Sequence, residues 1–481
     1  ASTNQSFGLP VTVAAGEAVK DVEIKFRPAG AITGRVLNED GEPMANVTVQ
    51  AMRYAYIGGK RRLNPEGQAQ TNDLGEYRIF NLLPKKYYVR ASVSNGEGFS
   101  LPTKRQSNKP AQAYWPVFYP DAKIAATATR LEVKPSDEQH ANFNLVPVDA
   151  YVVSGKVMGI PPSSGGQPGY GMAMLISKEW REPVGTAMLS PKDPSFEIGP
   201  VPPGSYQLVA FSAEITGTGT MSQGLQNFKT GHELVNVAGA NVSNVVVNLG
   251  SQNTVEVPGK IHVNPAPPAA VDLSRFYVTF ESADENSDME SAFADVGAMA
   301  SRSELGSGRT SKEGSFKAKF SGSSGIMQPH LGATGGFEDY YTKSILLGGR
   351  DVTESGISPA NLTPGATLEL IVSPYGGRID GVVLDSNKKP VVGAFVACVP
   401  EPKLRSRREL FITDTTNQQG HYVLRGLRPG SYKVYAFDEI DPGAIYSSEF
   451  LKPFEDMGES LTIQERDTVT KNLLVLHQTE D

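Results

Sequence analysis

The chain repeats a two-part pattern of short alternating segments, and this repeat limits its fold more than any other feature. The first part, ITGRVLNEDGEPMANVTVQAM at 32–52, aligns with IDGVVLDSNKKPVVGAFVACV at 379–399. The second part, TNDLGEYRIFNLLPKKYYVRAS at 71–92, aligns with TNQQGHYVLRGLRPGSYKVYAF at 416–437. Such self-similarity indicates copies of one supersecondary unit, so we expect the copies to fold alike.

Two weaker copies lie between these two, and every copy ends in a hairpin-like tail. The weaker copies comprise 153–160 with 194–212, and 257–264 with 276–282 and 310–320. The tails lie at 129–148, 232–250, 359–374 and 459–477, and a fifth tail, LPVTVAAGEAVKDVEIKF, lies at 9–26. The pattern therefore has four bodies and five tails, and the tail without a body precedes the first copy.

Alternation within each copy predicts β-strands. In Tyr432, Val434 and Ala436 every second side chain faces one way, as in a half-buried strand. The 49 glycines and 34 prolines are spread along the chain, which fits many turns between short strands. A length of 481 residues suggests about three or four domains. We expect an all-β protein.

Aromatic residues at matching positions of the strong copies are expected in the cores. One tyrosine of each copy follows a turn glycine, and another begins the returning strand after a proline turn. The expected core residues are Tyr77, Tyr88, Tyr422 and Tyr432, with Val36 and Val383 facing the same cores.

These repeats resemble the carboxypeptidase regulatory-like domain, a transthyretin-like or collagen-adhesin-B-like β-sandwich. GRVLNEDGEPMANVTV, TNDLGEYRIFNLLPKKYYVRA, GVVLDSNKKPVVGAFV and TNQQGHYVLRGLRPGSYKVYAF carry the resemblance. The segments YYTKSILLGGRDVTESGI (340–357) and DEIDPGAIYSSEFLKPFEDMGESLTI (438–463) are similar to multi-repeat exported proteins frequent in Acidobacteriota. The resemblance implies tandem Ig-like sandwiches outside the cell and, since the family's domain is an accessory one, no catalysis.

The repeats divide the chain into an N-terminal orphan hairpin and four sandwich domains. The expected bounds are 1–26 for the hairpin, 27–148 for a sandwich with an aromatic insertion, 149–250 and 251–374 for two diverged sandwiches, and 375–481 for the last. Links such as LVPVDAYVVSG and SPYGGRIDG are too short for a flexible coil. We therefore expect a semi-rigid rod.

No pattern of a catalytic or cofactor site is present in the sequence, so we predict no enzyme activity and no cofactor. The six histidines are scattered singly, without the spacing of zinc ligands. Neither a G-x-S-x-G elbow nor a Walker loop occurs. The net charge of -7 argues against nucleic acid as a partner, and no apolar run is long enough to span a membrane.

Four further features have an ordinary interpretation that we favour over a functional one. Cys398 fits a small buried apolar position on a strand, and the basic cluster at 403–408 fits a solvated loop. The acidic segment 38–42 fits a plain turn better than a calcium site. Lys156 and Asn248 match only loosely the pair that forms an isopeptide bond in some adhesin-B-like domains.

Two aromatic clusters are candidates for binding a ligand or partner. The insertion AYWPVFYP at 113–120 and the segment MRYAYIGG at 52–59 supply the rings. The candidate residues are Tyr54, Tyr56, Tyr114, Trp115 and Tyr119. Exposed planar rings could stack on sugar or hold a partner, whereas rings tucked against the sandwich wall would form a satellite core. We favour the satellite core.

The orphan tail is the candidate for self-association. Its apolar residues Val11, Val13, Val22, Ile24 and Phe26 have the alternation of a half-buried hairpin. A lone hairpin is marginally stable and its open edge invites pairing. The tail could fold back on the first repeat, be the stub of a removed or disordered domain, or add to a sheet of the next subunit. We favour strand addition over the stub.

The sequence therefore predicts a non-enzymatic extracellular structural or adhesive protein. Strand addition by the orphan tail would assemble it head-to-tail into a surface filament, a homopolymer. The alternative is a secreted accessory module that binds carbohydrate or peptide, and a cell-surface polysaccharide or protein is the expected further partner.

Overall fold

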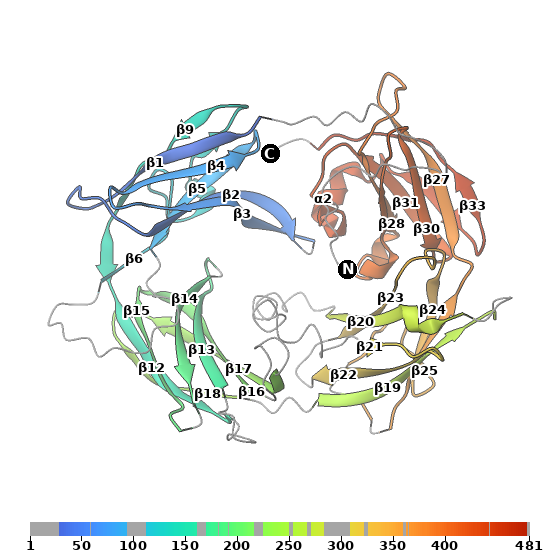
Figure 1. Cartoon of the computed structure of the whole chain (residues 1–481), viewed down its shortest axis with the longest axis horizontal. Helices are drawn as coiled ribbons and strands as arrows, with labels where there is room; N and C mark the ends of the chain where they lie inside the picture. The colour runs from blue at the N-terminus through green and yellow to red at the C-terminus, as the bar shows by residue number, and fades with distance from the viewer. Residues whose placement is uncertain are drawn as a thin grey trace.

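The computed structural model shows an almost entirely β protein of four sandwiches (Figure 1). The structure describes residues 28–57, 59–93, 112–160, 170–180, 182–190, 192–215, 225–249, 254–266, 271–282, 308–321, 326–358, 362–363, 365–441 and 443–478. Each sandwich has one sheet on the outside of the assembly in Figure 1 and one sheet facing its centre, which we call the outer and inner sheets. The tandem β-sandwich fold predicted from the repeats is confirmed.

The first and second sandwiches each consist of an outer and an inner sheet. The outer sheet of the first contains β1 (Gly30–Asn38), β4 (Glu76–Leu82), β9 (Glu138–His140) and β10 (Phe143–Leu145). Its inner sheet contains β2 (Val47–Ile57), β3 (Lys60–Gln70), β5 (Lys86–Val93), β7 (Val117–Phe118) and β8 (Arg130–Glu132). The short strands β6 (Gln112–Tyr114) and β11 (Pro147–Asp149) pair with each other, and η1 spans Ala125–Thr127. The second sandwich contains β12 (Tyr151–Met158), β15 (Ser195–Val201) and β18 (Val242–Asn248) outside, and β13 (Tyr170–Ser177), β14 (Pro183–Leu189), β16 (Gly204–Ile215) and β17 (Leu225–Val237) inside.

The third and fourth sandwiches follow the same plan. The third contains β19 (Thr254–Val263), β22 (Ser315–Ser321), β24 (Tyr341–Leu347), β25 (Arg350–Asp351) and β26 (Leu368–Ser373) outside, and β20 (Phe276–Ser282), β21 (Gly308–Arg309) and β23 (Met327–Ala333) inside, with η2 at Leu273–Arg275. The fourth contains β27 (Gly377–Leu384), β30 (His421–Leu427), β33 (Thr468–Thr470) and β34 (Leu473–Leu474) outside, and β28 (Phe395–Pro400), β29 (Ile412–Thr415), β31 (Gly430–Phe437) and β32 (Glu459–Ile463) inside. Its short helices are η5 (Pro402–Leu404), η6 (Arg408–Leu410), η7 (Ala444–Tyr446), α2 (Ser448–Leu451) and η8 (Lys452–Phe454).

Each sandwich has its own apolar core between its two sheets. In the first, Ile32 and Val36 of the outer sheet pack in one cluster with Val49 and Val89 of the inner sheet. Separate clusters fill the second, third and fourth sandwiches. Val36 and Val383 are fully buried in the first and fourth cores, as expected. The sequence bounds of the domains remain a proposal.

The first strand of a sandwich binds two neighbours, and a glycine makes this possible. β1 pairs antiparallel with β4 and parallel with β9 and β10, near the end of the repeat. A Cβ atom at Gly34 would lie 1.9 Å from the carbonyl oxygen of Ala141, so only glycine fits beside the returning strand. The hydroxyl of Tyr77 donates to this same carbonyl at 2.6 Å.

The glycine contact recurs in two other sandwiches. Gly155 and Gly381 each approach a carbonyl of the parallel strand, and a Cβ atom at either position would lie 1.9 Å from the carbonyl oxygen. In the fourth sandwich Tyr422 donates to the carbonyl of Lys471 at 2.8 Å, as Tyr77 does in the first. Buried Tyr77 and Tyr422 therefore hold the last strand of the repeat on the first.

One predicted core residue is wrong. Tyr88 is only half-buried, whereas its neighbour Tyr87 is fully buried and donates to the carbonyl of Leu83 at 2.8 Å. Tyr432 makes the equivalent bond to the carbonyl of Arg428 at 2.8 Å. Tyr87 and Tyr432 each stand three residues after a turn proline, so the proline fixes the register and the Tyr87–Tyr88 doublet misled the alternation pattern.

The hairpin turns are closed by amide or carboxylate side chains. The side-chain oxygen of Asn38 accepts from the backbone N–H groups of Asp40 and Glu42, at 3.0 and 2.8 Å. Asp385 makes the same pair of bonds in the fourth sandwich. The segment 38–42 is therefore a side-chain-capped turn. In the part of the chain that the structure describes, no three His, Cys, Asp or Glu residues are grouped to hold a metal ion.

The isopeptide pair is not brought together. Lys156 and Asn248 are both exposed on the outer sheet of the second sandwich. Their Cα partners in the parallel ladder are Val246 and Met158, respectively, so the two side chains are out of register. The geometry that the bond requires is absent.

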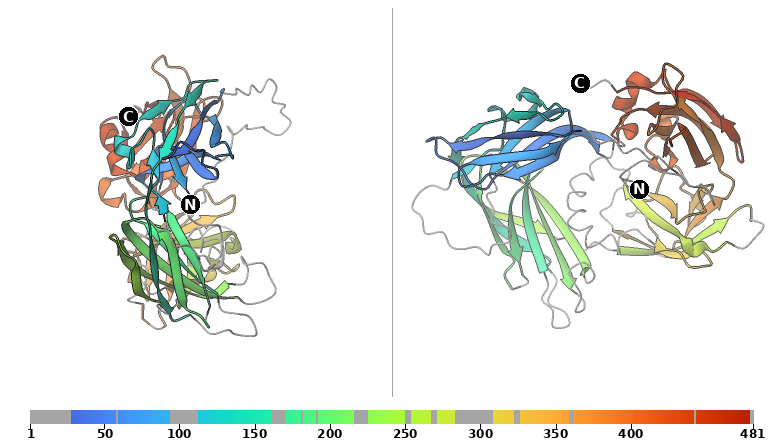
Figure 2. Two further views of the ribbon diagram at one scale, coloured as in Figure 1. Left: turned by 90° about the vertical axis from the view of Figure 1, so that its left-hand side faces the viewer. Right: turned by 45° about the horizontal axis from the view of Figure 1, so that its top comes forward.

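The four sandwiches are arranged in a ring, and the expected rod is wrong. Figure 1 shows the sandwiches around a common centre, and Figure 2 shows the first and fourth side by side. The guanidinium of Arg53 forms an ion pair with Asp441 at 3.0 Å, which joins the first repeat to the last. The links are short, as the sequence predicted, and a short link can connect two sandwiches at an angle as well as in a straight line.

Truncation of a core tyrosine tests the register of the fourth sandwich. Tyr432→Ala removes a buried ring and should cost about 3–5 kcal/mol of the stability of this sandwich. Tyr432→Phe removes only the hydroxyl bond to Arg428 and should cost about 0.5–1.5 kcal/mol. Hydrogen exchange of the β27 and β31 amides in the full chain measures both, and a loss below about 1 kcal/mol for the alanine variant would contradict the packing.

Candidate functional site

The candidate polymerisation segment lies outside the described residues. Its apolar residues belong to the first 27 positions of the chain: Val11, Val13, Val22, Ile24 and Phe26. Strand addition by this segment stays a prediction.

The aromatic insertion lies against the first sandwich and the start of the second. Tyr114 and Tyr119 are partly buried against the first core, and Tyr119 contacts Phe143 edge-to-face, with ring centroids 6.1 Å apart. Trp115 packs edge-on against Trp180 of the second sandwich, with centroids 5.1 Å apart. The rings are thus packed, as in the satellite core that the sequence favoured, and form no flat platform. A role of these rings in binding stays a prediction.

A buried arginine strengthens the joint between the first and second sandwiches. Arg90 is only 3% exposed, and its guanidinium contacts the carboxylate of Glu182 across the joint. It also donates to the side-chain oxygen of Gln50 at 2.6 Å. Because a buried charge must be paired, this contact fixes how the two sandwiches meet.

The joint between the third and fourth sandwiches centres on carboxylates. Glu465 accepts from the hydroxyls of Tyr341 and Ser373, at 2.9 and 2.7 Å. These hydrogen bonds, first that of Ser373 and then that of Tyr341, lower the pKa of the Glu465 carboxyl. Asp339 holds Arg425 through two bonds of 3.0 and 3.2 Å. Both carboxylates of this joint, those of Glu465 and Asp339, therefore have hydrogen-bond partners across it.

The ring closes where the first sandwich meets the fourth. The ring of Tyr56 lies edge-on to Phe450 of α2, with centroids 5.4 Å apart, and packs against the apolar cluster under the short helices. Lys85 pairs with Glu439 at 2.9 Å. Arg53 adds the ion pair with Asp441. We call these contacts between residues 53–85 and 439–450 the closing joint.

Electrostatics keep Arg53 charged at the closing joint. Burial alone lowers the pKa of its guanidinium, but the hydrogen bond to Asp441 and the charges of Asp441 and Glu66 raise it overall. Glu66 lies 2.7 Å from Arg53 on the first sandwich itself. Arg53 thus bridges its own sandwich and the last one.

The basic cluster at 403–408 is only in part the solvated loop that the sequence predicted, because Lys403 and Arg408 are exposed but Arg405 and Arg407 are not. Arg405 contacts Glu455, and Arg407 lies 2.6 Å from Glu409, with both arginine side chains less than a tenth exposed. The hydrogen bond and charge of Arg405 lower the pKa of Glu455. The prediction is wrong for these two arginines because Glu455, distant in the chain, and Glu409, two residues away, pair with them and allow their burial.

A small pocket opens at the closing joint. It has a volume of about 110 Å³ and is lined by both sandwiches. We call it the Arg–Tyr pocket, and its lining comprises Arg53, Tyr54, Tyr56, Arg61, Lys85, Lys86, Tyr88 and Arg130 with Asp441 and Gln478. Two of the aromatic residues singled out in the sequence, Tyr54 and Tyr56, therefore meet in one cationic pocket.

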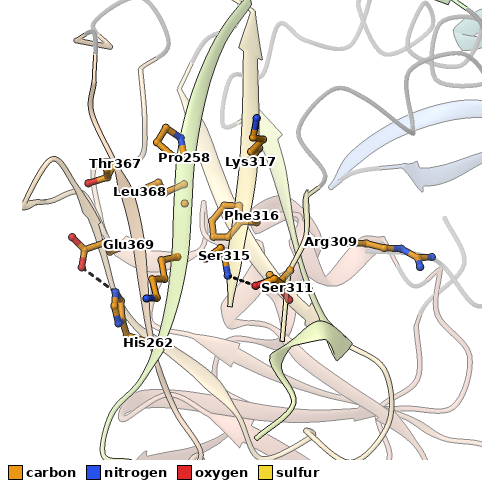
Figure 3. Close-up of a pocket in the computed structure, with 13 residues that line it drawn as sticks. Pro258, His262, Arg309, Ser311, Ser315, Phe316, Lys317, Thr367, Leu368 and Glu369 are labelled. Atoms are coloured by element: carbon orange, nitrogen blue, oxygen red, sulfur yellow. Dashed lines mark hydrogen bonds and ion pairs between the residues drawn. The ribbon is translucent and has the colours of Figure 1, made fainter. Parts of the chain in front are cut away.

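A second hollow lies on the outer sheet of the third sandwich. It has a volume of about 950 Å³ and runs across β19, β22 and β26 (Figure 3). Its polar side chains include His262 and Glu369, whose Nε2 and Oε2 atoms are 3.3 Å apart. Ser311 and Ser315 close a turn at its edge with a 3.2 Å bond. The charges here are paired or spread over a broad surface.

Cys398 is packed as an apolar residue. Its side chain is fully buried in the fourth core, as the alternation predicted, and burial raises the pKa of the thiol. Burial likewise raises the pKa of Tyr87 to about 12.

Among the described residues, no helix is long and apolar enough to cross a membrane.

Sequence reasoning missed the partners across the joints. Trp180, Glu182 and Asp441 belong to copies other than the residues they contact, and no periodicity connects them. One signal was available: the segment 438–463 interrupts the alternation with apolar residues that a strand pattern leaves unexplained, among them Phe450. This segment forms the helical cover that receives Tyr56.

Comparison with known proteins gives no family. No family model and no curated protein matches the chain, so the carboxypeptidase regulatory-like resemblance stays a prediction. Among solved structures, a streptococcal ancillary pilin is 12% identical over 68% of this chain and 99% of that one, with a TM-score of 0.19. The major pilin subunit BcpA of Bacillus cereus is 11% identical over 93% of this chain and 99% of that one, with a TM-score of 0.17.

A leucine-rich repeat protein from Bacteroides thetaiotaomicron is also similar. It is 11% identical over 47% of this chain, which spans only 26% of that one, with a TM-score of 0.17. TM-scores this low show no shared arrangement of the whole chain.

Removal of two contacts should open the closing joint. Ion pairs near the surface contribute about 0.2–1 kcal/mol and aromatic pairs about 0.5–1.5 kcal/mol beyond burial, so one substitution should leave the ring mostly closed. We expect Tyr56→Ala combined with Asp441→Ala to raise the radius of gyration measured by small-angle X-ray scattering.

Glu449→Ala is the matched control, because Glu449 is exposed on α2 beside the joint. It should leave the radius of gyration unchanged. A double variant as compact as the wild type would show that the closing joint does not hold the ring.

Proposed function

We propose that this chain is a non-enzymatic, exported structural or adhesive protein of the cell surface. The observation that supports this most is the closing joint, through which the first and last sandwiches are held together by Arg53–Asp441, Lys85–Glu439 and Tyr56–Phe450. A chain of stiff sheets joined in this way holds its exposed loops at fixed positions. That is the property a scaffold or adhesin needs.

The polar chemistry of the described residues supports the same proposal. Asn38 and Asp385 close turns, and Glu465 and Glu182 serve the joints between sandwiches. Tyrosine hydroxyls such as that of Tyr77 hold backbone carbonyls. These groups have structural partners, which suits a protein with a mechanical role.

The finer part of the proposal is assembly into a filament through residues 9–26. In this hypothesis the segment adds as a strand to a sheet of the next subunit. Within the described strands, one edge of each outer sheet is formed by β4, β15, β22 or β30. An added strand would pair along the open side of such an edge strand. Because the closing joint already occupies surfaces of the first and fourth sandwiches, the filament must use other surfaces.

Deletion of residues 1–26 tests both levels of the proposal. Gold-labelled antibody on intact cells should mark fibres on the wild-type surface, and should mark the surface without fibres for the deletion variant. Purified full-length protein should sediment as polymers, and the variant as a monomer.

The outcomes separate the two levels. Fibres that persist without residues 1–26, or a full-length protein that stays monomeric at high concentration, would contradict strand addition alone. Absence of label from the surface of intact wild-type cells would contradict the surface function itself.

A second candidate function is a secreted module that binds carbohydrate or peptide. The Trp115 platform that it would use is packed against Trp180. The Arg–Tyr pocket favours this candidate instead, because cationic and aromatic side chains converge there on a space of about 110 Å³.

A further inference from the structure

The Arg–Tyr pocket lies where the first and fourth sandwiches meet. The first sandwich contributes its cations and tyrosines from β2, β3, β5 and β8, and the fourth contributes Asp441 and Gln478. Opening the closing joint would remove one wall. The pocket is therefore a composite site whose formation depends on the ring.

The acids around the pocket are already used by two of its cations. Arg53 holds Glu66 at 2.7 Å and Asp441 at 3.0 Å. Lys85 holds Glu439 at 2.9 Å. Within the described residues, Arg61 and Lys86 form no ion pair, although both line the pocket. A chain with a net charge of -7 thus concentrates unneutralised positive charge at this place.

The aromatic side chains orient the guanidinium of Arg61. The guanidinium carbon of Arg61 lies 4.5 Å from the ring centroid of Tyr54. Tyr54 in turn lies edge-on to Tyr88, with centroids 5.7 Å apart. A stacked guanidinium presents its N–H donors as a planar fork, which matches the two oxygens of a carboxylate. Rings such as that of Tyr88 offer an apolar surface to a sugar ring.

We propose that the Arg–Tyr pocket binds the carboxylate of an acidic sugar unit, with Arg61 and Lys86 as the binding cations. This inference rests on the second candidate function and specifies its ligand class. The volume of about 110 Å³ admits a carboxylate and part of its sugar ring, so the remainder of a polysaccharide would lie outside the pocket.

Calorimetric titration of the full chain with oligogalacturonate tests the site. We expect binding to the wild type, and a loss of affinity of about tenfold or more for the variant Arg61→Ala/Lys86→Ala, because two charge-assisted contacts are removed. Lys192→Ala removes an exposed cation from the second sandwich and should bind like the wild type. Absence of binding to the wild type, or equal affinity of all three proteins, would overturn the proposal.

Three further titrations define the ligand and the role of the ring. A neutral glucose oligomer should not bind, and acetate and sulfate should bind more weakly than oligogalacturonate. Equal affinity for the plain anions would overturn the assignment to an acidic sugar. The ring-opened variant Tyr56→Ala/Asp441→Ala should lose binding, and full affinity there would overturn the composite site. Surface labelling of intact cells is independent of these results, so a failure here is distinct from a failure of the surface function.

Discussion

The fold depends on the close approach of two parallel backbones, which a glycine permits in three of the four repeats. Gly34 and Gly381 lie so near a carbonyl of the returning segment that a Cβ atom would be placed 1.9 Å from its oxygen. Tyr77 and Tyr422 then donate to those carbonyls. The first strand is therefore paired on both sides. Its second partner lies near the end of the repeat, so the next sandwich begins shortly after this pairing.

This way of ending a repeat explains why the links between sandwiches are short. The last strand of one sandwich lies beside its first strand, so only a few residues remain for the link to the next sandwich. Contacts such as Arg90–Glu182 and Asp339–Arg425 then fix the angle at two of the joints. The inner sheets face one another across the ring, and the helical cover on β28 and β31 meets Tyr56. The links place the four sandwiches around the ring, and the closing joint connects the fourth sandwich to the first.

Much of the sandwich fold was predictable because its determinants are local. The alternation, the turn residues and the buried Tyr422 and Tyr432 all follow from residues close in the chain. Tyr88 was wrong because alternation cannot choose between two adjacent tyrosines, whereas the spacing from Pro84 selects Tyr87. The ring and the Arg–Tyr pocket were not predictable, since Arg53 and Asp441 are brought together only by the summed bends of the joints.

The distance between the first and fourth sandwiches tests the ring most directly. Spin labels on Ile57→Cys and Glu449→Cys would flank the contact of Tyr56 with Phe450, and buried Cys398 would remain unlabelled. Pulsed electron paramagnetic resonance on the otherwise unchanged chain should give one short, narrow distance distribution. A broad distribution centred at long distances, as an extended rod of four sandwiches would give, would contradict the closed ring.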